Sequence, residues 1–189
     1  MPASVTAKLY FIFWLVLFSS AVQAESFSVS SAQITKIGNG YELNATIKYP
    51  LTPRIKEALD NGVPIVFSQE LELFKSIPLL GKYWQWQETL WTTEIRHELR
   101  YHALSQQYVL HAIDTNSQRN FPSLNVALNA LGKIQSLNLP PEYLDDTKNT
   151  ILQLRSGIDL YALPTPMRPG ALISSKWQLT SPWVEAQWD

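Results

Sequence analysis

Polar and apolar residues alternate along much of the chain, and this alternation predicts strands. In YELNATIKY, residues 41–49, every second position from Tyr41 is apolar or aromatic and the positions between are polar. Such a period of two is typical of a strand with one buried face and one wet face. The run SFSVSSAQITKI precedes it, and the turn signal GNG at residues 38–40 separates the two. Together they predict a β-hairpin.

Two short helices interrupt the strand pattern. In the first, Thr52 is the expected N-cap, Pro53 suits the first helical position, and Gly62 lies just past the end, where a left-handed residue is favoured. The second is FPSLNVALNALG, residues 121–132, which is apolar on one side and stops at Gly132. Both helices are expected to be brief insertions in a β domain.

The remaining strand candidates complete the predicted fold. VPIVFSQELELF, residues 63–74, places Ile65, Phe67, Leu71 and Leu73 on one face, and residues 84–114 are strand-like apart from one turn. Residues 150–164 and 176–188 are the last two candidates, joined through the proline-rich PTPMRP. We therefore expect a mainly β domain, α+β at the margin. It is an antiparallel β-sandwich or curled sheet of about seven strands with two short inserted helices.

The first 24 residues have the pattern of a secretory signal peptide. Lys8 precedes the apolar run LYFIFWLVLF, and the small residues Val22 and Ala24 precede the expected cleavage point. The alternative is an uncleaved membrane anchor, but the run is short for a span of about 20 residues. The predicted organisation is a signal peptide at 1–24 and a single β-rich periplasmic domain at 25–189.

Composition narrows the classes of chemistry. The chain has 15 basic and 16 acidic residues and no cysteine. A near-neutral charge gives no electrostatic reason to expect nucleic acid or an anionic membrane surface as partner. Without cysteine there is no disulfide, thiol nucleophile or thiolate-bound metal, and an exported chain of this kind fits a bacterial periplasm.

The stretch HELRYH, residues 97–102, resembles the H-E-x-x-H helix of zinc proteases but has the wrong spacing. His97 and His102 are five residues apart, and at about 100° per residue they would diverge on a helix. On a strand they point to opposite faces. The register of the next turn, near Ser105, decides which of these faces holds His111. At most two histidines then share a face, so we expect no metal and no cofactor.

Other catalytic patterns are equally weak. Glu70 and Glu72 share a strand face and are in principle an acid–base pair, although a solvated strand surface explains them more simply. The sequence has no G-x-S-x-G elbow, Walker loop or G-x-G-x-x-G. We therefore expect a protein that is not an enzyme.

Tryptophan is the more unusual signal, because the expected mature chain has six. Most should fill the core, but exposed tryptophans anchor protein interfaces or stack on sugars. The predicted interaction face combines one tryptophan pair with a charged strand face. Its residues are Trp84, Trp86, Arg96, Glu98, Arg100 and His102.

Several blocks resemble an exported proteobacterial family called domain of unknown function 4390. The most specific are RYHALS with QY, residues 100–105 and 107–108, and the terminal W-x-L-x-S-x-W from Trp177 to Trp183. Residues 109–113 are more apolar than is usual in the family. The resemblance implies export and one β-rich domain, and carries over no catalytic residue. Genes of this family often neighbour one for a membrane sensor histidine kinase of the nitrogen-regulation type.

Three functional hypotheses follow. The first is a non-enzymatic periplasmic module that binds an envelope protein, and the extracytoplasmic part of such a sensor kinase is one candidate partner. The second is a periplasmic carrier of a sugar or lipid fragment, with tryptophans lining a pocket. The third and weakest is a hydrolase that uses Glu70 and Glu72, or a mixed histidine–carboxylate metal site.

Overall fold

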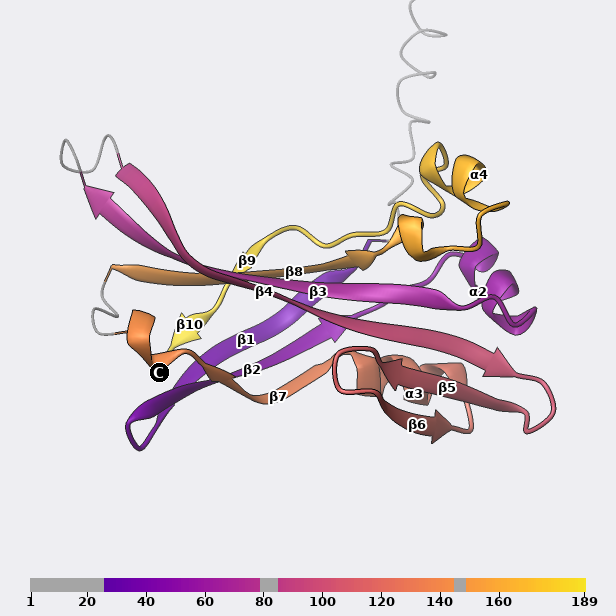
Figure 1. Cartoon of the computed structure of the whole chain (residues 1–189), viewed down its shortest axis with the longest axis horizontal. Helices are drawn as coiled ribbons and strands as arrows, with labels where there is room; N and C mark the ends of the chain where they lie inside the picture. Colours follow the sequence, from indigo (N-terminus) through magenta and orange to yellow (C-terminus); the bar gives the residue numbers. More distant parts are fainter. Residues whose placement is uncertain (1–25, 79–84, 145–148) are drawn as a thin grey trace, which may run out of the picture.

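Two β-sheets pack face to face in the computed structural model, which describes residues 26–78, 85–144 and 149–189 (Figure 1). The smaller sheet has the strand order β10-β1-β2-β7, and the larger has the order β6-β5-β4-β3-β8-β9. The predicted β-rich sandwich is therefore confirmed. The elements are β1 Ser28–Ile37, β2 Gly40–Lys48, α2 Pro53–Asp60, β3 Ile65–Pro78, β4 Gln85–His102, β5 Gln107–Ala112, β6 Ser117–Phe121, α3 Leu124–Leu131, β7 Lys133–Leu139, β8 Thr150–Ile158, α4 Arg168–Leu172, β9 Val184–Glu185 and β10 Gln187–Trp188, with 3-10 turns at Pro141–Tyr143 and Leu160–Ala162.

Local sequence signals produce the hairpin and helix ends that were predicted. β1 and β2 pair in antiparallel register across the turn at Gly38. The Thr52 side chain accepts a hydrogen bond from the Ile55 N–H and so caps α2. Gly62 has φ +79°, the left-handed conformation that glycine adopts without strain. These elements depend little on the rest of the chain.

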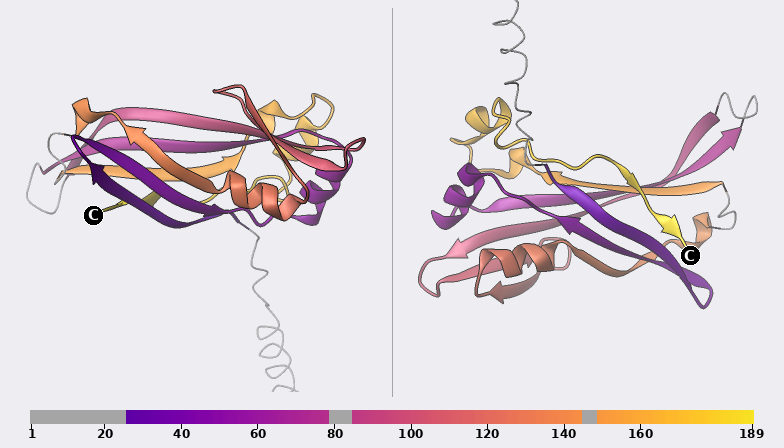
Figure 2. Two further views of the ribbon diagram at one scale, coloured as in Figure 1. Left: turned by 90° about the horizontal axis from the view of Figure 1, so that it is seen from below. Right: turned by 180° about the vertical axis from the view of Figure 1, so that it is seen from behind.

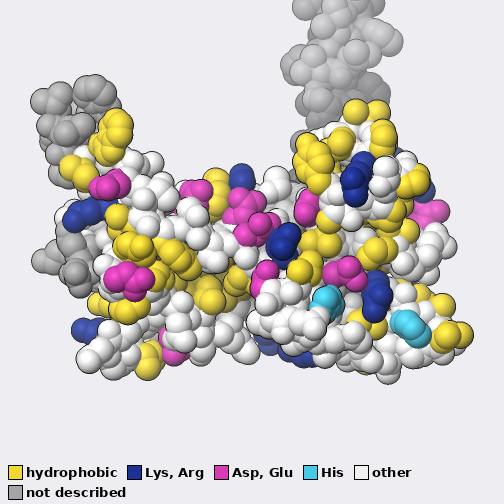
Figure 3. Space-filling model, viewed as in Figure 1, with side chains coloured by type: hydrophobic (Ala, Val, Ile, Leu, Met, Phe, Trp, Pro, Cys, Tyr) yellow, Lys and Arg dark blue, Asp and Glu magenta, His cyan; other side chains and the backbone are white. Residues whose placement is uncertain are grey.

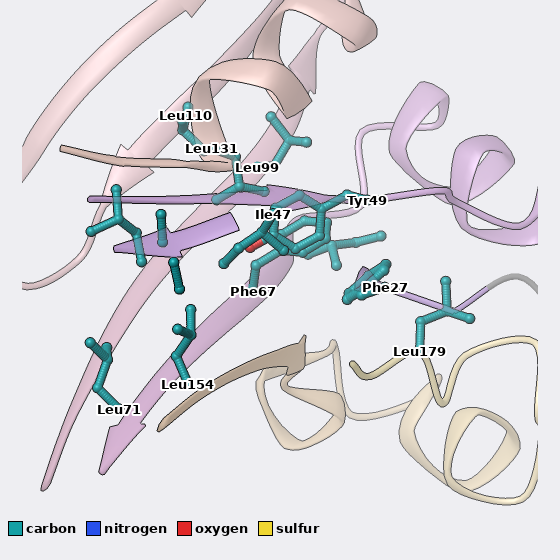
Figure 4. Packing of buried hydrophobic residues seen from close by; sticks show 14 of the residues in the cluster. Phe27, Ile47, Tyr49, Phe67, Leu71, Leu99, Leu110, Leu131, Leu154 and Leu179 are labelled. Carbon is teal, nitrogen blue, oxygen red and sulfur yellow. The ribbon is translucent and has the colours of Figure 1, made fainter. Parts of the chain in front are cut away.

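The core lies between the two sheets. β3 presents the predicted apolar residues Ile65, Phe67, Leu71 and Leu73 to the interior, all fully buried. At one end, the rings of Phe27, Tyr49 and Phe67 form a cluster in which centroids lie 4.8–6.0 Å apart (Figure 4). Edge-to-face pairs of this kind add to the stabilisation from burial.

A buried hydrogen-bond network crosses this core. The Gln69 amide donates to the Tyr49 hydroxyl at 3.0 Å and to the Leu131 carbonyl at 2.9 Å. The Tyr49 hydroxyl also lies 2.9 Å from the Ser156 hydroxyl, and burial raises the pKa of Tyr49. Ser156 in turn donates to the Ser68 carbonyl at 2.6 Å. Three buried polar side chains and two backbone carbonyls are thus paired where unpaired groups would be costly.

The C-terminal segment closes one side of the sandwich. Trp177, Leu179 and Ser181 alternate as buried residues, and the Ser181 hydroxyl accepts a hydrogen bond from the Ser156 N–H at 2.9 Å. Beyond them, β9 pairs with β8 and β10 pairs with β1, so one segment joins the edges of both sheets (Figure 2). The W-x-L-x-S-x-W pattern thus has a structural explanation.

Helix α3 covers part of the opposite side, between β6 and β7 (Figure 2). Its end is held very close to β2, because the Ile47 N–H donates to the Gly132 carbonyl at 2.7 Å. A Cβ on Gly132 would lie only 2.1 Å from the Ile47 carbonyl oxygen. Glycine is required here by close backbone approach, in addition to its place at the helix end.

Several parts of the fold differ from the prediction, among them helix α4, which begins within the proline-rich stretch that was expected to be a connection. β6 and β7 were not predicted. SQRNF is polar except for Phe121, and KIQSLNL is held in the sheet by β2 through a bulged register. Residues 176–188 were expected to form one strand. Most of this stretch is extended but pairs only through a single bridge at Thr180 and the two short strands β9 and β10. Because this segment pairs with the edge strands of both sheets, it cannot pair with either edge strand along its whole length.

Replacement of Ser181 by alanine should destabilise the fold. Ser181→Ala leaves the buried Ser156 N–H without an acceptor, and we expect a loss of about 1–3 kcal/mol in the free energy of unfolding. The matched control is Ser174→Ala in the same segment, where no side-chain hydrogen bond is lost. Urea denaturation of both variants measures the difference. Equal stabilities would show that the network does not hold the C-terminal segment.

Candidate functional site

The three histidines do not converge. A turn at residues 103–106 sets Glu98 opposite His111, and His97 opposite Ala112. His111 therefore shares the outer face with His102, and His97 lies on the inner face beside Leu99. The nearest polar partners are local: His102 Nδ1 lies 3.1 Å from the Ser105 hydroxyl, and His111 Nε2 lies 2.9 Å from the Asn116 side-chain oxygen. Within the described ranges, no three His, Cys, Asp or Glu side chains are placed to hold a metal ion.

His97 is a partly buried histidine on the inner face. Its Nδ1 atom is buried and has no hydrogen-bond partner within the described part of the chain. Burial lowers the pKa of His97, and the positive charge of Arg119 lowers it further, while the Asp114 carboxylate opposes the shift. The neutral imidazole is therefore the form that the folded protein favours.

The charged strand face lies on one side of β4, as the alternation predicted. Arg96, Glu98, Arg100 and His102 all face outward from the larger sheet, with Arg96 paired with Ser68 and Arg100 with Val109. Arg100 Nε lies 3.9 Å from the Glu98 carboxylate. An exposed ion pair of this kind contributes little to stability. The binding role of this face stays a prediction.

Side chains from β8 hold Glu70 and Glu72. The Arg155 guanidinium donates to the Glu70 carboxylate at 2.7 and 3.1 Å, and the Gln153 amide donates to Glu72 at 3.0 Å. Arg155 also lies over the Trp183 ring, 4.5 Å from its centroid. Cross-strand pairs are the usual means of stabilising a sheet surface, which explains these carboxylates without catalysis.

Trp86 lies on the opposite face of the sheet from the charged strand residues, so the two parts of the predicted interaction face do not share one surface. A binding role for either part stays a prediction. Leu73 pairs with Trp91 but Phe74 pairs with Thr89, so Leu90 is an extra residue in β4. This β-bulge reverses which positions face outward. Trp86 consequently pairs with Ile77, on the side that continues the core. In the sequence, the two adjacent apolar residues Leu90 and Trp91 interrupt the alternation and so indicate the bulge. Trp84, the other predicted tryptophan of the interaction face, lies outside the described residues.

Most described tryptophans are structural, as expected. Trp177 is buried, and Trp91 and Trp188 pack partly buried against the core. Trp188 makes an edge contact with the Tyr41 ring at 5.5 Å. Trp86 differs, because 61% of its surface is exposed.

Trp86 belongs to an arm that projects beyond the sandwich. β8 pairs with β3 only as far as Lys75, whereas β3 and β4 continue together to Pro78 and Gln85. Figure 1 shows this two-stranded arm rising away from both sheets. An exposed tryptophan on a projecting hairpin is suited to contact another molecule.

A long free edge runs along β4 next to the arm. β5 pairs only with His97 to His102, so among the described strands none pairs with this side of β4 from Gln85 to Ile95. The Arg96 N–H points to this side, where it donates to the Asp114 carboxylate at 3.0 Å, and the Arg96 carbonyl accepts from the Ile113 N–H at 2.9 Å. Since strand residues alternate, Glu94 and Thr92 also direct their N–H and C=O groups outward.

Apolar side chains accompany this edge. Leu90, Trp91 and Ile95 are only partly buried against the core, as is Leu137 on β7. In the view of Figure 3, apolar side chains form a band between the N-terminal half of β4 and β7, as comparison with Figure 1 shows. The edge itself carries Glu88 and Glu94 and no basic residue. This edge was not predicted, although the unequal lengths of the predicted strands around residues 104–106 were a sign of it.

Comparison with known proteins identifies the family. The family model described as "Domain of unknown function (DUF4390)" matches residues 24–187, so the chain belongs to this family. Searches of curated proteins and of solved structures found no match. Among the helices that the structure describes, none has the length and apolar character needed to span a bilayer.

The partly buried His97 should make stability depend on pH. In the unfolded chain His97 has an ordinary pKa of about 6.5, above its lowered value in the folded protein. Below about pH 6.5 the unfolded state therefore takes up a proton that the folded state resists, and stability falls. In His97→Leu this contribution disappears, so the free energy of unfolding should decline less between pH 7 and pH 5. His102→Gln, at an exposed site, is the control, and an unchanged slope in His97→Leu would contradict this assignment.

Proposed function

We propose that this member of the DUF4390 family is a non-enzymatic periplasmic module that binds another envelope protein by adding one of its strands to the free edge of β4. The observation that carries the proposal is the unpaired edge at residues 85–95, which lies beside an apolar band and a projecting arm. The signal-peptide pattern of residues 1–24 supports the proposed compartment. Because genes of this family often neighbour one for a membrane sensor histidine kinase, the extracytoplasmic part of such a kinase is a candidate partner.

The backbone of the edge supplies the affinity in this proposal. Natural proteins usually cover or blunt such an edge, because its unpaired N–H and C=O groups pair readily with another strand. β5 and the Asp114 carboxylate cover β4 only as far as Arg96. The next outward groups, on Glu94 and Thr92, are available to an incoming strand. Strand addition uses these groups for affinity and side-chain positions for specificity.

The side chains around the edge describe the partner segment. One side of an added strand would meet the apolar band of Leu90, Trp91 and Ile95. The edge carries Glu88 and Glu94, which favours a segment with lysine or arginine. A second copy of this chain is a poorer partner, because pairing two such edges would gather four carboxylates without a basic residue between Gln85 and Ile95.

Loss of one outward N–H should weaken binding without breaking the hairpin. Thr92→Pro removes an N–H that β3 does not use, and proline is tolerated on a sheet edge. An unpaired partner carbonyl costs about 1–3 kcal/mol, so we expect roughly tenfold less complex. The matched control is Thr92→Val, which keeps the N–H. The measurement is crosslinking in the native host from a photoreactive residue at exposed Gln87, followed by mass spectrometry.

The two variants distinguish the competing functions. One dominant envelope protein that crosslinks in Thr92→Val and is strongly reduced in Thr92→Pro supports strand addition. Equal yields in the two variants would contradict it. A carrier of a lipid or sugar fragment would contact side chains of the apolar band instead. It would then bind both variants equally and give no protein adduct. Thermal unfolding of both variants confirms that the proline has not disrupted the fold.

A further inference from the structure

A cavity of about 440 Å³ lies where α3 bridges the edges of the two sheets. β6 supplies Arg119, α3 supplies Asn129, and β7 supplies Lys133 and Gln135. Val126 and Ala130 of α3 complete the lining. The cavity is distinct from the free edge of β4, because it lies beside the part of the larger sheet that β5 and β6 complete.

The polar groups of this cavity have no partners among the residues described. Neither Arg119 nor Lys133 forms an ion pair there, and Asn129 and Gln135 make no side-chain hydrogen bond. The Arg119 guanidinium lies 5.6 Å from the centroid of the Phe121 ring, a contact that helps to fix its position without using its N–H donors. Four exposed residues whose side chains have free donors therefore line one open cavity.

The residues that line the cavity carry two positive charges, on Arg119 and Lys133, and no negative charge. Between residues 103 and 139 the only acidic residue is Asp114, and its carboxylate already accepts a hydrogen bond from the Arg96 N–H. The charge of Arg119 also lowers the pKa of His97 on β4, two strands away in the same sheet. A field of this sign, beside amide donors, attracts an anion with oxygen acceptors.

We propose that this cavity binds a small oxyanionic ligand through a phosphate or carboxylate group. Arg119 and Lys133 approach the anion from the edges of the two sheets, and Asn129 and Gln135 donate to its remaining oxygens. The planar guanidinium of Arg119 is suited to pair with two oxygens at once. The cavity near α4 is a weaker candidate, because its Arg54 is already paired with Glu57 at 3.0 Å.

Titration of the purified protein with inorganic phosphate, and separately with succinate, tests the site. Backbone amide shifts in NMR spectra are followed at constant ionic strength, with sodium chloride as reference. We expect saturable shifts at Asn129, Lys133 and Gln135. Arg119→Gln or Lys133→Gln should each weaken binding by about fivefold or more. The control Arg54→Gln should leave binding unchanged.

The outcomes distinguish a ligand that carries a phosphate group from one that carries a carboxylate group. Tighter binding of phosphate points to a phosphate ester, and tighter binding of succinate points to a carboxylate ligand; both support the site. Shifts that merely follow sodium chloride would overturn the proposal, as would saturable binding that is equal in Arg119→Gln, Lys133→Gln and the unchanged protein. Because Thr92 on the β4 edge is untouched here, this result is independent of the partner-binding test.

Discussion

The hydrogen bonds around Ser156 are the constraint on which the arrangement of the two sheets depends. Ser156 lies on the inner face of β8, fully buried, and joins Tyr49 at the end of β2 to Ser181 in the C-terminal segment. Gln69 extends the same network to the end of α3 through the Leu131 carbonyl. Polar groups in an apolar interior are costly unless every one is paired. The network therefore specifies one relative placement of β2, β3, β8, α3 and the terminal segment.

This placement leaves the sandwich closed on one side and partly open on the other. The C-terminal segment is tied down through Ser181, and so it covers the edges of β8 and β1. On the opposite side, α3 is held against β2 at Gly132 and covers only the part of the seam next to β5 and β6. The N-terminal half of β4 is beyond its reach. The same interactions that stabilise the core thus determine which edge is left for a partner.

Local patterns in the sequence predicted the elements whose structure is determined by residues close together in the chain. The alternation in β2, the Thr52 cap and the buried face of β3 need only nearest neighbours along the chain. β6 and β7 were missed because pairing with neighbouring strands, and not an alternating pattern in their own sequences, makes these segments strands. The bulge at Leu90 also escaped prediction, although the shift of apolar residues from even to odd positions at Leu90 and Trp91 records it. That single extra residue separates Trp86 from the charged strand face.

The candidate site was predictable to a smaller extent, because it depends on where neighbouring strands stop. The free edge exists because β4 has 18 residues and β5 only six, and Asp114 then caps the next N–H. Likewise, Arg119 and Lys133 come from strands that their own sequences do not predict. A binding site that forms at the edges of the sheets can be recognised only once the pairing of the strands is known.

Amide hydrogen exchange along β4 is the direct test of whether a partner adds a strand to this edge. It should be measured on the isolated protein and again with its crosslinked partner bound. We expect the amides of Thr92 and Glu94 to exchange quickly in the isolated protein and to become protected in the complex, whereas those of Thr93 and Ile95 should be protected in both. If Thr92 and Glu94 stayed unprotected in the complex, the partner would bind elsewhere and strand addition to β4 would be wrong.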